Sequence, residues 1–151
     1  MNKATYVIFF GLTALSALAT AQTTDVKNAD HQKLILADDG SWIKNMSSIG
    51  AVQTVLCILG PQNAIQASRH KTVSQIWYVT NGQGQAWLSD SGGHESLIDL
   101  KPGVSFAVPL GYSFQFRNTG NVDLNIFIVN TTPWTGDGEL IPVENHWRPR
   151  F

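Results

Sequence analysis

The stretch of sequence that decides the fold is Ser68-Arg69-His70-Lys71-Thr72-Val73-Ser74-Gln75-Ile76-Trp77-Tyr78-Val79-Thr80-Asn81-Gly82. Its run from Gln75 to Val79 is rich in β-branched and aromatic residues, which predicts a strand. The pair Asn81-Gly82 closes that run and is typical of a turn. We therefore expect a strand that ends in a glycine turn.

Short strands of the same kind are expected along the chain from Leu34 onward. Clusters rich in Gly, Pro, Asn and Ser separate them. Their side chains alternate: Val104, Phe106 and Val108 share one face of one such strand. The candidate strands are Val52 to Leu59, Gln75 to Val79, Gln85 to Leu88, Val104 to Val108, Phe114 to Phe116 and Leu124 to Val129. With no convincing helical stripe after the N-terminal segment, the sequence predicts one all-β domain, a sandwich or a small barrel.

The first segment, residues 1–21, is predicted to be a cleavable signal peptide. Lys3 precedes an apolar run from Tyr6 to Ala19, and Ala19-Thr20-Ala21 has the small-x-small pattern of a cleavage site. The run is shorter than the roughly 18–20 apolar residues needed to span a bilayer, so a retained membrane anchor is the weaker alternative. Removing 21 of the 151 residues leaves 130, beginning at Gln22. We expect a periplasmic or secreted protein.

Charge and cysteine content narrow the possible partners. The formal charge is −1, and loss of Lys3 with the signal peptide makes it −2. Nucleic acids and anionic membrane surfaces require clustered cations, so we expect no nucleic acid and, after signal cleavage, no membrane as a partner. Cys57 is the single cysteine, which rules out an intrachain disulfide. It lies within an apolar run, and we expect a buried, inert thiol.

With these residues in place, the chain resembles the cupin superfamily. The first cupin motif reads Gly, five residues, His-x-His, three or four residues, Glu, six residues, Gly. With its last glycine at Gly82, the glutamate position falls on Gln75 and the two histidine positions fall on Ser68 and His70. The opening glycine of the motif falls on Gln62.

The second cupin motif reads Gly, five residues, Pro-x-Gly, two residues, His, three residues, Asn. Gly103, Pro109, Gly111 and Asn118 match at the required spacings, whereas Phe114 stands at the histidine position. The tail from Pro133 to Glu139 is similar to one in a set of small bacterial cupins of poorly defined activity. The resemblance covers roughly Val52 to Trp147.

This resemblance implies a single-domain cupin jelly-roll, or double-stranded β-helix, barrel. The expected organisation is a signal peptide (1–21), an N-terminal arm with a first strand (22–47), a barrel domain (48–147) and a tail (148–151). The resemblance is specific for the fold and not for a function, because cupins include isomerases, dioxygenases, decarboxylases, sugar-binding proteins and storage proteins.

In metal-binding cupins the two histidines, the glutamate and the later histidine hold one divalent ion. Here only His70 remains as a strong ligand, because Gln75 is neutral and Phe114 cannot coordinate. We therefore expect a degenerate metal motif and no cofactor, with a divalent transition metal at a rebuilt site as the alternative. The remaining histidines that could rebuild it are His31, His94 and His146.

By the family register, the glutamate and histidine positions point into the barrel. Alternation then carries Gln75 and Trp77 inward together, and Phe114 and Phe116 inward from the second strand, leaving Gln115 on a less buried face with Arg117. A shift by one residue would reverse this and turn Ser113, Gln115 and Arg117 inward.

The function that these residues favour is binding of a small organic molecule in the barrel without a metal. Its expected site is His70, Gln75, Trp77, Phe114 and Phe116, which together give apolar walls and two polar groups. The alternative is that the aromatic rings simply fill the barrel. His70 would then be a core histidine hydrogen-bonded to Gln75.

Three other functions stay open. A metal-independent isomerase or epimerase would use His70 as acid or base, although the sequence shows no second titratable group beside it. A Ser68–His70 nucleophilic pair lacks an acidic orienter. A metal-dependent oxygenase would require the rebuilt site, and an interaction module would use the arm and tail to form a homodimer.

Overall fold

The computed structural model describes residues 24–133 and 138–151. The predicted signal peptide and its cleavage site lie outside these residues. The described part of the chain forms one 3-10 turn and eleven strands. They are η1 (Ala29–His31), β1 (Ile35–Leu36), β2 (Trp42–Ile49), β3 (Val52–Leu59), β4 (Ser68–His70), β5 (Gln75–Asn81), β6 (Gly84–Ser89), β7 (Glu95–Leu100), β8 (Ser105–Val108), β9 (Ser113–Asn118), β10 (Leu124–Asn130) and β11 (Leu140–Pro142).

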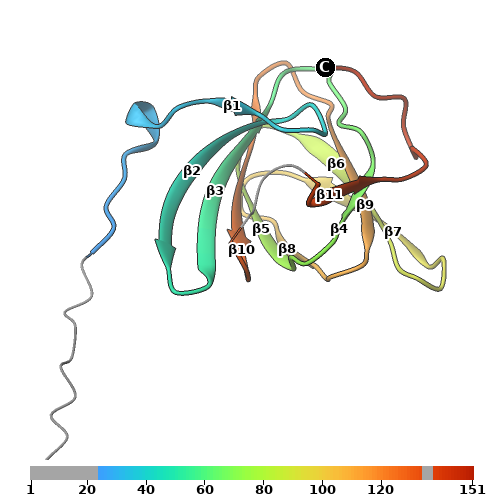
Figure 1. Ribbon diagram of the computed structural model, residues 1–151. Coiled ribbons are helices and arrows are strands. Elements are labelled where there is room, and N and C mark those ends of the chain that lie inside the picture. The colour runs from blue at the N-terminus through green and yellow to red at the C-terminus, as the bar shows by residue number, and fades with distance from the viewer. Residues whose placement is uncertain (1–23, 134–137) are drawn as a thin grey trace, which may run out of the picture.

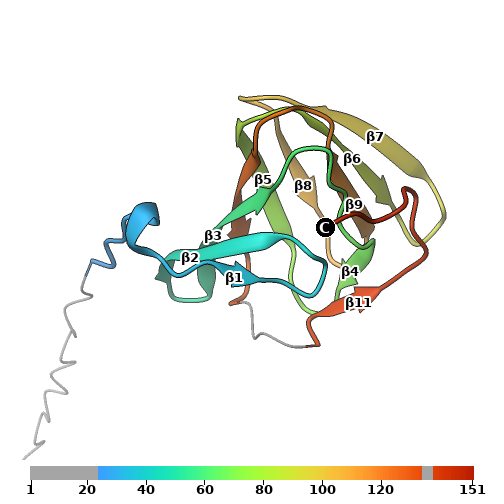
Figure 2. The ribbon, with the colours of Figure 1, turned by 90° about the horizontal axis from the view of Figure 1, so that it is seen from above.

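The strands form two antiparallel sheets that face each other, as Figures 1 and 2 show. One sheet has the order β1-β2-β3-β10-β5-β8, and the other has the order β11-β4-β9-β6-β7. The two motifs come together within the second sheet. There β4, from the first motif, pairs with β9, from the second, and Ser68 lies opposite Phe114. No helix in the described residues is long and apolar enough to cross a membrane.

The six strands expected from the sequence are all present, with ends that differ by at most two residues. Five further strands were not among these candidates: β1, β2, β4, β7 and β11. β7 is an edge strand whose residues are mostly exposed, so it lacks the apolar alternation of a half-buried strand. β11 has three residues and ends at Pro142, on the opposite edge of the same sheet.

The core lies between the sheets and follows the expected alternation. In β5, Gln75, Trp77 and Val79 are buried, while Ile76 and Tyr78 are exposed. In β10 the buried positions are likewise every second residue. Phe114 and Phe116 are buried in the same core, which confirms the register in which they point inward.

The motif glycine at position 82 is required by two features of its surroundings. Its φ angle is +82°, and a Cβ atom there would lie 2.6 Å from the carbonyl oxygen of Asp123. Only glycine fits such a backbone approach in the left-handed region. This close packing joins the end of β5 to the turn before β10.

The outer side of β9 is more buried than the sequence predicted. Gln115, expected on a less buried face, is 0% exposed. The segment after β11, residues 143–151, runs over this side of the sheet, and the Gln115 amide binds its backbone: Nε2 donates to the Trp147 carbonyl (2.8 Å) and Oε1 accepts from the Trp147 N–H (2.8 Å). A long-range cover of this kind leaves no local pattern, and the expectation was wrong for this reason.

Candidate functional site

The five side chains expected in the site do lie together inside the barrel. They surround a cavity of about 20 Å³, which has room for about one water molecule. Side chains therefore fill most of the interior. The cavity is lined by Asp39, Ser41, Ile43, Val55, Cys57, His70, Gln75, Trp77, Phe114, Phe116, Ile128 and Leu140.

Aromatic rings form the apolar wall of this cavity. The Trp77 ring meets Phe114 and Phe116 edge to face, with centroids 5.5 Å and 5.2 Å apart. The His70 ring stacks on Phe114 at 5.1 Å. Edge-to-face and offset stacking are the preferred geometries of aromatic pairs, so these rings hold one another in fixed orientations.

Gln75, at the position of the motif glutamate, belongs to a neutral hydrogen-bond network. Its Oε1 accepts from the Trp77 indole N–H at 2.7 Å, and its Nε2 donates to Asn130 Oδ1 at 2.9 Å. The amide needs both its acceptor and its donor here. A carboxylate could not donate to Asn130, which explains physically why glutamine suits this barrel.

His70 lies at the centre of the site, buried on β4. Burial lowers the pKa of its imidazole, while a hydrogen bond with Gln75 and the negative charge of Glu139 act in the opposite direction. The net shift is downward, so the ring is neutral at pH 7. Its Nδ1 lies 3.7 Å from Glu139 Oε1.

Glu139 is the residue that the sequence did not reveal. It lies directly before β11, and its carboxylate accepts hydrogen bonds from the backbone N–H groups of Lys71 (3.1 Å), Thr72 (2.8 Å) and Val73 (3.2 Å) and from the Thr72 hydroxyl (2.9 Å). Burial alone would raise the pKa of Glu139, but these hydrogen bonds, together with the charge of His70 when that ring is protonated, hold it below its usual value. The expectation that no second titratable group lies beside His70 was wrong.

Asp39 and Ser41 add a second polar group to the cavity lining. Asp39 Oδ1 accepts from the Ser41 N–H at 2.9 Å and from the Ser41 hydroxyl at 2.7 Å. Burial raises the pKa of this carboxyl. Cys57 is buried in the same lining, and burial raises the pKa of its thiol, as expected for an inert cysteine. Neither Asp39 nor Ser41 belongs to a cupin motif, so the resemblance could not point to them.

The residues at the motif positions do not fit a metal ion. Phe114 stacks on His70 at the place where a second imidazole would stand. Within residues 24–133 and 138–151, no group of three or more His, Cys, Asp or Glu side chains could hold an ion. The other histidines do not line the cavity: His94 lies beside Asp90 at 3.0 Å, and His146 stacks on Trp87 on the outer side of β6.

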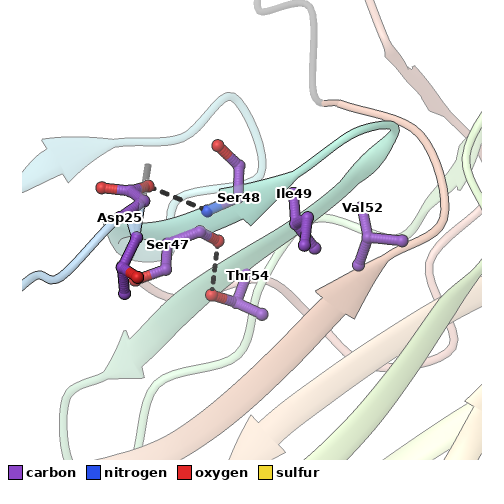
Figure 3. A pocket seen from close by; sticks show the side chains of 7 residues that line it. Asp25, Ser47, Ser48, Ile49, Val52 and Thr54 are labelled. Carbon is purple, nitrogen blue, oxygen red and sulfur yellow. Dashed lines mark hydrogen bonds between the residues drawn. The ribbon is translucent and has the colours of Figure 1, made fainter. Parts of the chain in front are cut away.

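A separate pocket lies outside the barrel, at the hairpin of β2 and β3 (Figure 3). It encloses about 420 Å³ and shares no lining residue with the interior cavity. Asp25 of the N-terminal arm accepts from the Ser48 N–H at 3.0 Å, and Thr54 donates to the Ser47 carbonyl at 2.8 Å. The Asp25 bond docks the arm on the hairpin, the Thr54 bond joins the two strands of the hairpin, and none of these residues lines the His70 cavity.

Comparison with known proteins agrees with this fold. The family model described as Cupin matches residues 43–140. The capsular polysaccharide assembling protein CapF from Staphylococcus aureus is similar in structure, with a TM-score of 0.65, 13% identity, and coverage of 76% of this chain and 34% of that one. Oxalate decarboxylase from Bacillus subtilis gives a TM-score of 0.70 at 12% identity, over 82% of this chain and 33% of that one.

The chain thus spans about a third of the length of these two proteins. At such low identity the likeness concerns the fold alone. No curated protein matches the sequence.

Proposed function

Because the chain belongs to the cupin family, we propose that its barrel binds a small organic molecule without a metal. One observation supports this proposal above others: polar side chains from separate elements line one aromatic cavity, Asp39 and Ser41 from the loop between β1 and β2, His70 from β4 and Gln75 from β5. Burying polar groups costs free energy, and a barrel filled only for stability has no need of them. Apolar walls with a few convergent polar groups are the usual composition of a ligand site.

The size of the cavity constrains this binding. About 20 Å³ accommodates about one water molecule, so a larger ligand must displace side chains that line the cavity. The ligand-binding arrangement is then a minor state of the free protein, and the apparent affinity falls in proportion to its population. We expect association to be slower than diffusion allows and to slow further as ligands grow.

A thermal-shift screen of small polar organic compounds tests the proposal. Binding compounds should raise the Tm of the wild type and should lose that effect in His70→Ala. Tyr78→Ala, on the outward face of β5, is the matched control and should keep the effect. If no compound raises the Tm of the wild type, the interior is a filled core and the proposal is wrong.

A second candidate function rests on the 3.7 Å distance between His70 Nδ1 and Glu139 Oε1. A carboxylate beside an imidazole stabilises the imidazolium that forms when the ring accepts a proton. This supports a metal-independent isomerase or epimerase in which His70 moves a proton within a carbonyl substrate. Turnover should survive a chelator, vanish in His70→Ala and fall in Glu139→Gln. Turnover that a chelator abolishes would exclude it.

Export to the periplasm or beyond belongs to the same proposal and rests on the sequence of residues 1–21 alone. Expression of the whole chain in a bacterial host should yield a periplasmic or secreted protein. Mass spectrometry of that protein should show a new first residue at Gln22. Recovery of the uncleaved chain in the cytoplasm would contradict export.

A further inference from the structure

A groove on the outer side of the barrel gathers an unusual share of the positive charge. It encloses about 290 Å³ between the turn before Ala64, the end of β9 and the segment after β11. Arg117, Arg148 and Arg150 line it, and these are three of the four arginines in the chain. No Asp or Glu is among its lining residues, although the whole chain carries a formal charge of −1.

The groove is built from anchored parts. Arg117 lies with its guanidinium 4.5 Å from the centre of the Trp147 ring, and its Nε donates to Gln85 Oε1 at 3.2 Å. The Arg150 backbone pairs with Ala64 in both directions, at 2.8 Å and 2.9 Å. Because Trp147 is also fixed through Gln115, Arg148 lies on a short span held at both ends. A ligand would therefore meet a fixed backbone frame and an Arg117 side chain that is already held in place.

The far wall of the groove is fixed in a similar way. Gln62 adopts a φ angle of +60°, and among the described residues it is the one non-glycine residue with positive φ. Its side-chain amide donates to the carbonyls of Thr119 (3.1 Å) and Gly120 (2.9 Å). These bonds hold the turn before Ala64 against the turn after β9, so both walls keep their spacing.

The three guanidinium groups have no acidic partner within the described residues. None of the ion pairs found in residues 24–133 and 138–151 includes an arginine. Three like charges around one groove repel one another, and an anion in the groove would relieve this repulsion. Guanidinium groups bind the paired oxygens of carboxylates and phosphates through two parallel N–H bonds.

We propose that this groove binds a small organic polyanion, a molecule that carries two or more carboxylate or phosphate groups. Its volume is at the small end of the range for ligand sites, which suits a compact molecule. The site is separate from the barrel interior, since the groove and the interior cavity share no lining residue. The inference is therefore independent of the function proposed for His70.

Isothermal titration calorimetry at constant ionic strength tests this site. Citrate and pyrophosphate serve as divalent or higher anions, and acetate serves as the single carboxylate. Citrate or pyrophosphate should bind the wild type with 1:1 stoichiometry and at least roughly tenfold more tightly than acetate. Arg148→Gln and Arg150→Gln should each weaken that binding roughly tenfold. Arg69→Gln, an exposed arginine on β4 outside the groove, is the matched control and should leave the affinity unchanged.

The outcomes separate the possibilities cleanly. Preference for citrate over pyrophosphate identifies a carboxylate ligand, and the reverse preference identifies a phosphate ligand. Equal weakening by Arg69→Gln would mean general charge attraction and would overturn the proposal. Equal affinity for acetate and citrate, or no binding heat at millimolar concentrations, would overturn it as well. Because Arg148 and Arg150 are exposed, circular dichroism should show that both variants keep the wild-type fold.

Discussion

At the scale of single residues, His70 predicts a measurable dependence of stability on pH. Burial holds the pKa of the folded ring below its ordinary 6.5, so the unfolded chain binds this proton more readily than the folded chain does. Stability should therefore fall as the pH drops through about 6.5 towards the folded value, by at most about 1.4 kcal/mol per pH unit. Urea denaturation of the wild type and His70→Phe between about pH 7.5 and pH 5.5 measures this contribution as the difference in slope.

Asp39 and Glu139 also have shifted pKa values, and each adds its own dependence of stability on pH. The raised pKa of Asp39 acts in the opposite direction, because the folded chain holds that proton more tightly than the unfolded chain. The lowered pKa of Glu139 adds a loss of stability only below about its ordinary 4.5. Both the wild type and His70→Phe contain Asp39 and Glu139, so the difference between their slopes cancels both contributions. An unchanged slope in His70→Phe would contradict the prediction.

Glu139 predicts a large loss of stability when its carboxylate is removed. Glu139→Ala leaves the backbone N–H groups of Thr72 and Val73 without their acceptor, while the Lys71 N–H keeps its bond to the backbone carbonyl of residue 139. Each unsatisfied group costs about 1–3 kcal/mol, so the free energy of unfolding should fall by about 2 kcal/mol or more. Glu144→Ala, at an exposed position after β11, is the control and should change it by less than about 0.5 kcal/mol. Similar losses in the two variants would show that the contacts of Glu139 do not stabilise the fold.

The sequence predicted the inward-facing residues far better than their polar partners. Alternation places Gln75, Trp77, Phe114 and Phe116 on the interior, because period two relates neighbours on one strand. Glu139 meets the loop of residues 71–73 from more than sixty residues away. Such contacts depend on how strands pair across the molecule, and a local pattern contains no record of that pairing.

At the scale of elements, a comparison of two glycine turns distinguishes the cost of an unfavourable backbone conformation from the cost of a steric clash. Gly82 and Gly93 have nearly equal φ angles of +82° and +80°, but a Cβ at Gly82 would meet the Asp123 carbonyl, whereas one at Gly93 would meet nothing within 4 Å. Gly93→Ala should cost about 1–2 kcal/mol for the left-handed conformation alone. Gly82→Ala should cost more, because the turn must also move away from β10. Chemical denaturation measures both, and equal losses would refute the role given to close packing.

Two of the strands missing from the candidates share one physical cause. β7 and β11 lie at the two edges of the same sheet, and their residues do not alternate between core and solvent. Edge strands are held mainly by hydrogen bonds to one neighbour, and those bonds require no particular side chains. Inner strands such as β5 and β10 must bury every second residue, so their sequences record their position.

At the scale of the whole molecule, the two outer faces differ. The segment after β11 covers the outer side of β9 and β6, where His146 stacks on Trp87 and Trp147 binds Gln115. The outer face of the six-stranded sheet exposes large apolar side chains instead: Trp42 is 41% exposed, Tyr78 46% and Ile76 52%. Phe127 of β10 pairs with Tyr78 of β5, so these apolar groups extend across neighbouring strands. We predict that two copies of the chain associate through this face, whereas the sequence had suggested the arm and tail as the homodimer contact.

Sedimentation equilibrium tests that association directly. The wild type should approach twice the monomer mass as its concentration rises through the micromolar range, and Ile76→Lys should remain a monomer because a lysine ammonium cannot be buried in an apolar interface without a partner. Leu97→Lys places the same charge on an exposed leucine of β7, in the other sheet, and should leave the dimer intact. A wild type that stays monomeric at every concentration would contradict the predicted homodimer. If Ile76→Lys and Leu97→Lys weaken the dimer equally, the contact lies elsewhere on the surface.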